Sequence, residues 1–209
     1  MAHHQKLPLA LLALVAVALV ASAISPNDRL TWWLEALPVL IGAPLLIFTA
    51  RRFPLTNLLY VLIACHALIL ILGAHYTYAQ VPLGEWARDT FGLMRNPYDR
   101  LGHLAQGFVP AIIAREILLR KSVVARGGWL FFVVTSICVA LSACFELFEW
   151  LTAVIGGGSA DAYLATQGDV WDTQWDMFCA LCGAVIAQLT LSSAHDRALM
   201  RLGVSSPFR

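Results

Sequence analysis

Long apolar stretches alternate with short polar ones along the chain, and six of the apolar stretches match the length of a membrane crossing. They cover residues 7–24, 32–50, 56–79, 101–119, 129–150 and 171–192. A helix needs about 20 residues to cross about 30 Å of hydrocarbon, and these runs lack the two-residue alternation of an outer-membrane barrel strand. The pattern therefore predicts an all-α polytopic membrane protein, a bundle of six transmembrane helices.

Composition agrees with this prediction. The chain has 209 residues, of which 59% are hydrophobic and 13% are charged, whereas a soluble domain carries about 25% charged residues. It contains no internal repeat, no low-complexity tract and no linker long enough to separate domains. We expect one integral membrane domain over residues 1–209.

The charges predict how the bundle is oriented. Ten of the 14 Lys and Arg residues fall in the N-terminus, the second and fourth loops and the C-terminal tail, which share one side of the predicted bundle. Of the 13 acidic residues, Glu116 and Asp196 fall on that side and the others on the opposite side. The positive-inside rule then places both termini in the cytoplasm and the acid-rich helix ends at the outer face. The same rule explains the basic groups without a nucleic-acid partner.

The first apolar run permits two interpretations. Lys6, the apolar core and Ala21-Ser22-Ala23 resemble a secretory signal peptide with a small-residue cleavage site. We favour an uncleaved helix because the run is long for the apolar region of a signal peptide. The orientation of the other helices is the same in both cases.

Ionisable side chains, with one glutamine among them, gather at the predicted outer ends of the last three helices. Steps of three or four residues place the members from each helix on one face. These members are Asp99, His103 and Gln106, then Glu146 and Glu149, then Asp172 and Asp176. Because a carboxylate in or near hydrocarbon costs several kcal/mol, such a cluster indicates a functional site.

The residue types in this cluster suggest roles. A histidine beside paired carboxylates is an arrangement used for general acid/base catalysis. The predicted catalytic residues are Asp99, His103, Glu146 and Asp176. The predicted substrate-binding residues are Arg100, which is available for a phosphate, Gln106, Glu149, Asp172 and His75. The structural alternatives are that Asp99 and Asp172 cap their helices and that His103 is a packed core residue.

So many like charges need compensation if they meet in one cavity. Three sources are open: shared protons, the side chains of Arg95 and Arg100 folded over the acids, and a divalent metal. Carboxylate and imidazole ligands suit Zn, Mn, Mg or Fe. The candidate metal ligands are Asp99, His103, Glu146, Asp172 and Asp176.

The sequence around these residues resembles the YjdF-type inner-membrane proteins, a family of unknown function. The resemblance is densest at NPYDRLGHLAQG (residues 96–107), ELFEW (146–150) and TQGDVWDTQWDM (166–177). More distantly, Asp-x-x-x-His at 99, an acid late in the next helix and Asp-x-x-x-Asp at 172 resemble the VanZ-like family, which is associated with glycopeptide resistance. Ala180 stands where that family usually has Asn. The resemblance implies a bacterial inner-membrane location and supports a site without naming its reaction.

The first functional hypothesis is an enzyme that acts at the outer leaflet on a lipid or lipid-linked envelope substrate. The alternatives are a proton- or cation-coupled transporter or sensor, and a non-catalytic assembly protein whose polar cluster holds helices together. Against transport, the cytoplasmic halves of the predicted helices carry few polar groups. The expected partners are the bilayer and a lipid or lipid-linked substrate. The sequence leaves open the reaction, the metal and the oligomeric state.

Overall fold

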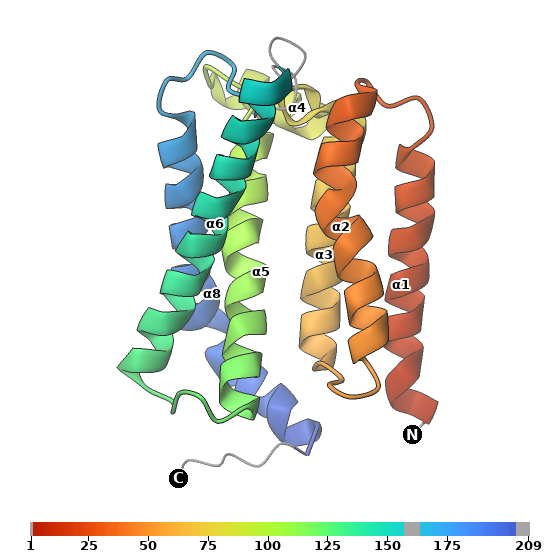
Figure 1. Ribbon diagram of the computed structural model, residues 1–209, viewed down its shortest axis with the longest axis vertical. Coiled ribbons are helices and arrows are strands. Elements are labelled where there is room, and N and C mark those ends of the chain that lie inside the picture. Colours follow the sequence, from red (N-terminus) through yellow and green to blue (C-terminus); the bar gives the residue numbers. More distant parts are fainter. Residues whose placement is uncertain (1, 157–163, 204–209) are drawn as a thin grey trace.

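The computed structural model describes residues 2–156 and 164–203. Within them, six helices of 20 residues or more form a bundle, and a shorter helix lies at one of its ends (Figure 1). The elements are α1 Ala2–Ser22, α2 Arg29–Thr49, α3 Asn57–Tyr76, η1 Tyr78–Gln80, α4 Pro82–Phe91, α5 Tyr98–Arg120, α6 Gly128–Gly156 and α8 Asp172–Arg201. The predicted all-α fold is confirmed.

The helices differ in how apolar they are. α2, α3, α6 and α8 are each long and apolar enough to cross a membrane, and α1 contains a shorter apolar segment, Lys6–Ser22. α5 is more polar because charged side chains lie near both of its ends, with Asp99 and Arg100 at one end and Arg115, Glu116 and Arg120 at the other. These lengths and compositions are those of a polytopic membrane protein.

The long helices form two groups of three. α1 and α2 both pack on α3, around a core that includes Val39 and Ala67. α5, α6 and α8 pack on one another around Val134 and Ala184. Contacts between α3 and α5 join the two groups (Figure 1).

The backbones of α5 and α8 touch near the middle of the bundle. A Cβ atom added to Gly107 would lie 1.8 Å from the carbonyl oxygen of Ala180, and one added to Gly183 would lie 2.1 Å from that of Leu104. Small residues allow this approach, which is a common way for membrane helices to pack. The contact fixes how the polar turns of α5 and α8 face each other.

Tyr78 fills the space between the two helix groups just below the turns that carry the acids. A Cβ atom on Gly73 of α3 or on Gly102 of α5 would lie 2.3 Å or 2.8 Å from its ring. The chain reaches this position through Thr77, whose φ is 60°. Burial raises the pKa of Tyr78 well above its usual value, and the nearby carboxyls of Glu35 and Asp99 raise it further, so the phenol keeps its proton.

The opposite ends of α5 and α8 hold a second buried polar group. Glu116 and His195 are completely buried, and Nε2 of His195 lies 3.0 Å from Oε2 of Glu116. Arg115 donates to Nδ1 of His195 at 2.7 Å and to Asp196 at 2.8 Å, and Arg120 donates to Glu116 at 2.8 Å. The helix halves predicted to be cytoplasmic were expected to carry few polar groups, and this expectation is wrong. The sequence pattern could not show that Arg115, Glu116 and His195 pair with one another inside the bundle.

Candidate functional site

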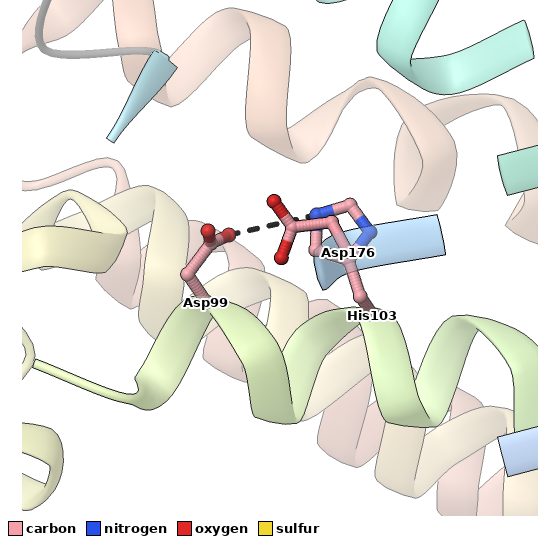
Figure 2. A group of neighbouring side chains, drawn as sticks. All are labelled: Asp99, His103 and Asp176. Atoms are coloured by element: carbon pink, nitrogen blue, oxygen red, sulfur yellow. Dashed lines mark ion pairs between the residues drawn. The ribbon is translucent and has the colours of Figure 1, made fainter. Parts of the chain in front are cut away.

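The first two turns of α5 and of α8 bring three ionisable side chains together. Asp99 and His103 lie one turn apart on α5, and Asp176 faces them from α8 (Figure 2). One carboxylate oxygen or ring nitrogen from each lies within 4.8 Å of the other two, and all three residues are buried. Nε2 of His103 lies 3.6 Å from Oδ1 of Asp99.

The His103 ring is oriented through its other nitrogen. Nδ1 lies 2.9 Å from Oε1 of Gln106, so Nδ1 carries a proton and donates it to that amide oxygen. In the neutral ring, Nε2 then has a free lone pair on the side of Asp99. Oε1 of Glu146, on α6, lies 3.6 Å from Nδ1. The imidazole therefore lies between carboxyls from two helices, with Nε2 on the side of Asp99 and Nδ1 on the side of Gln106 and Glu146.

Several buried oxygens in this region have no hydrogen-bond partner within the described part of the chain. They are Oγ of Ser142, Oε1 of Glu146 and Oδ1 of Asp176. Glu146 is 6% exposed and Asp176 is 2% exposed, so solvent does not satisfy them. Leaving such an atom unpaired costs about 1–3 kcal/mol, and folded proteins pair most of them. Three such atoms therefore gather in this part of the bundle.

Arg95 covers the acids from the loop before α5. It forms ion pairs with Asp172 and with Oδ2 of Asp99, the latter at 3.3 Å, and lies 3.6 Å from Asp169. Burial acts to lower the pKa of Arg95, but the hydrogen bond and charge of Asp172 outweigh it and raise the pKa above its usual value. This is one of the three sources of compensation expected from the sequence.

Neither aspartate at these helix starts is a cap. The N-cap residues are Pro97 for α5 and Trp171 for α8, and neither makes a side-chain capping bond. The carboxyls of Asp99 and Asp172 bind Arg95 instead. The capping alternative is therefore wrong for both, and Asp172 is committed to the arginine.

The loop that carries Arg95 is held in place by its neighbour Asn96, which is fully buried. The backbone N–H of Asn96 donates to Oε1 of Gln167 at 2.9 Å, and Nε2 of Gln167 donates to the carbonyl of Asn96 at 3.0 Å. Nδ2 of Asn96 donates to the carbonyl of Val81 at 3.1 Å. These bonds tie the segment before α5 to the segment before α8 and so keep the guanidinium over the acids.

Arg100 lies at the rim, not among the three central residues. It donates to Asp169 at 2.8 Å and its guanidinium carbon lies 5.3 Å from the centre of the Trp175 ring. A shallow, open and largely apolar surface adjoins this ring and is formed by Trp171, Gln174, Trp175 and Phe178. The rim thus combines a cation with an apolar surface.

The two remaining predicted residues differ in position. Glu149 is half-buried, one turn after Glu146, and interacts electrostatically with the cluster. His75 contacts the end of α1 instead: its Nδ1 lies 2.9 Å from the carbonyl oxygen of Ser22, and its ring packs edge-on against Tyr76. The structure therefore brings Glu149 to the cluster and gives His75 a contact between α3 and α1.

Two residues near the cluster were not singled out in the sequence. Glu35, on α2, is 4% exposed, and its carboxyl lies close enough to Tyr78 and Asp99 to interact with both electrostatically. His66, on α3, interacts with His103, and its Nε2 is buried without a partner among the described residues. Neither has another ionisable residue three or four positions away on its helix, so no spacing marks it. An isolated ionisable residue inside a membrane helix is itself the signal that identifies such residues.

Comparison with known proteins places the chain in a family. It matches the family model described as predicted membrane protein (DUF2238) over residues 7–197. It is 51% identical to the inner membrane protein YjdF of Escherichia coli (strain K12) over 186 residues, which cover 89% of each chain. No solved structure matches it. These matches confirm the YjdF-type resemblance and the bacterial inner-membrane location, while the VanZ-like resemblance stays a prediction. The chain belongs to the DUF2238 family of predicted membrane proteins.

Proposed function

We propose that this protein is a membrane enzyme that hydrolyses or transfers a group on a lipid or lipid-linked envelope substrate at the outer leaflet. The observation that carries the proposal is that buried oxygens of Glu146 and Asp176 have no hydrogen-bond partner among the described residues, beside an oriented histidine. A cluster that only held helices together would gain stability by pairing these atoms, since each unpaired atom costs about 1–3 kcal/mol. Reactive groups held ready for a substrate are the better explanation.

The proposal includes the topology expected from the sequence. α1 and α5 run alongside the four apolar helices (Figure 1), which supports six membrane crossings. α1 begins and α8 ends at the same end of the bundle (Figure 1), and the cluster of Asp99, His103 and Asp176 lies toward the other end. With both termini in the cytoplasm, the cluster opens toward the outer leaflet.

The roles follow from position. Asp99, His103 and Asp176 surround the reacting group, and Arg100 at the rim takes the anionic part of the substrate while its apolar chain lies along the neighbouring apolar surface. Glu146 accepts a proton from the attacking water as the bond between phosphorus and the lipid oxygen breaks, and the departing lipid oxygen then takes up that proton. A carboxylate placed near a reacting water is a common general base.

Lipid-phosphate hydrolysis tests the proposal. The purified protein in detergent micelles is given a polyprenyl diphosphate or phosphatidic acid, and released phosphate is measured. We expect Asp176→Asn and Glu146→Gln to lower the rate at least 100-fold, the lower range for loss of a general acid or base. Asp89→Asn is the matched control because this α4 side chain is 69% exposed. No release by the folded wild type, or equal release by all variants, contradicts the proposal.

Transport remains the second candidate because one observation favours it. Glu116 and His195 place ionisable groups in the half of the bundle where the sequence suggested few. The close contact of α5 and α8 at Gly107 and Gly183 leaves no space between these two helices for a path. A proton- or cation-dependent flux in proteoliposomes that is lost in Asp176→Asn would favour transport over hydrolysis.

A further inference from the structure

The three central side chains have the composition of a divalent-metal site. Two carboxylates and one imidazole are a donor set suited to Mn²⁺, Fe²⁺ or Zn²⁺, whereas Ca²⁺ and Mg²⁺ prefer oxygen alone. Around an ion at about 2.1 Å, neighbouring tetrahedral ligands lie about 3.4 Å apart. The distance of 3.6 Å between Oδ1 of Asp99 and Nε2 of His103 is close to this value.

The ring of His103 is held at one of its two nitrogens. Its Nδ1 lies 2.9 Å from Oε1 of Gln106, and its Nε2 lies 3.6 Å from Oδ1 of Asp99. Metal-binding histidines are typically fixed by a hydrogen bond at the ring nitrogen that does not bind the ion. One ring nitrogen of His103 lies within 4.8 Å of a carboxylate oxygen from Asp99 and of one from Asp176, so the three donor groups converge.

The unpaired atom of Asp176 is independent evidence for a ligand. Oδ1 of this residue has no hydrogen-bond partner in the described residues, the residue is 2% exposed, and its carboxyl lies beside the imidazole (Figure 2). Oε1 of Glu146 also has no hydrogen-bond partner in the described residues, and it lies 3.6 Å from Nδ1 of the same ring. Both atoms are too buried to be satisfied by bulk water.

Charge leads to the same conclusion. Asp99, Asp172, Asp176 and Glu146 meet around this centre, and Arg95 is the arginine that directly pairs with two of them. Arg100 is engaged with Asp169 at the rim. The second carboxylate oxygen of Asp99 remains available because Arg95 binds Oδ2 and leaves Oδ1 facing His103. A divalent cation supplies the positive charge that the cluster lacks.

We propose that Asp99, His103 and Asp176 bind one divalent transition-metal ion, with Asp172 held outside the ligand set by Arg95. The proposal rests on the proposed function only in that both concern the same site. Three protein ligands leave coordination positions open, which is the arrangement of catalytic rather than structural sites. When bound, such an ion polarises a substrate oxygen or activates water.

Direct binding of Mn²⁺ tests the site. The protein in detergent is freed of metal with a chelator, and Mn²⁺ is titrated while the free ion is followed by electron paramagnetic resonance. We expect about one ion per chain, and at least tenfold weaker binding in Asp176→Asn and His103→Ala, since even supporting residues contribute tenfold or more to affinity. Asp89→Asn, on the exposed face of α4, should bind as the wild type does.

A second measurement guards against misfolded variants. We expect Mn²⁺ or Zn²⁺ to raise the Tm of the wild type and of Asp89→Asn, and to leave that of Asp176→Asn unchanged even though it elutes as a folded species. Absence of binding by the folded wild type to Mn²⁺, Zn²⁺ and Fe²⁺ would overturn the proposal. Equal binding in wild type and both ligand variants would also overturn it, because the ion would then lie elsewhere.

The two proposals fail in different ways. Lipid-phosphate hydrolysis by a folded protein that binds none of the three ions would remove the metal site and leave the enzyme. Stoichiometric, Asp176-dependent Mn²⁺ binding without hydrolysis would leave the metal site and remove the enzyme.

Discussion

Substituting Gly107 by alanine should disrupt the bundle, whereas the same substitution at Gly42 should not. Both glycines lie inside helices, α5 and α2 respectively. A Cβ atom at Gly107 would lie 1.8 Å from the carbonyl oxygen of Ala180, and no atom lies within 4 Å of one at Gly42. The obstacle at Gly107 is backbone, so no side chain can rotate away from the added methyl.

The magnitude follows from the separation required. An ordinary contact begins at 3.4 Å, so α5 and α8 must move apart from 1.8 Å to at least that distance. Overpacking of a core costs about 1–3 kcal/mol where it can relax, and we expect about 3 kcal/mol here because two helices must shift. Gly42→Ala should instead gain up to about 1 kcal/mol, since alanine favours a helix over glycine.

Thermal unfolding in one detergent, with the two variants in parallel, measures both effects. For a chain of this size, 3 kcal/mol corresponds to a fall in Tm on the order of 10 °C. Gly107→Ala should also weaken Mn²⁺ binding, because two of the ligands lie on α5 and the third on α8, and the added methyl pushes these two helices apart. If Gly107→Ala were as stable as Gly42→Ala, the described packing of α5 on α8 would be wrong.

Three further outcomes follow from single contacts. Gln106→Leu should weaken Mn²⁺ binding about 10–100-fold, because the residue orients His103 and is not a ligand. It should lower the free energy of unfolding by no more than about 1 kcal/mol. Unchanged affinity in the same titration would refute this role. Glu116→Gln should lower stability by about 3 kcal/mol in thermal unfolding, because Arg120 and His195 lose a buried charged partner, yet leave Mn²⁺ affinity as it was. Tyr78→Ala should lower the free energy of unfolding by about 3–5 kcal/mol, as for other buried aromatic residues. Tyr78→Phe should retain the fold. An equal loss of stability in both variants would show that the hydroxyl rather than the ring matters.

The apolar runs predicted the helices well but not all of their ends. α8 continues to Arg201, nine residues beyond the expected end at 192, and α6 continues to Gly156 beyond the expected end at 150. Hydropathy ends a helix where polar residues begin. In α8 those residues include His195, which is buried against α5. A helix whose polar turn has internal partners therefore extends further than its hydropathy indicates.

The site was predictable where its members share one helix. The i to i+4 spacing of Asp99 and His103, and the further three residues to Gln106, gave contacts that the structure contains. Contacts between helices had no such signal. Nothing in the spacing indicated that Asp172 would bind Arg95 while Asp176 would face His103, because that distinction depends on how α8 is rotated against α5.

The glycine contact between α5 and α8 has a consequence for which parts of the site can move. Helices locked backbone to backbone shift together, so Asp99, His103 and Asp176 form one rigid wall of the site. α6 packs on that pair through side chains, which can slide and repack, and it carries Glu146 and Ser142. Any movement of one wall of the site against the other would therefore shift α6, with Glu146, while Asp99, His103 and Asp176 keep their places relative to one another.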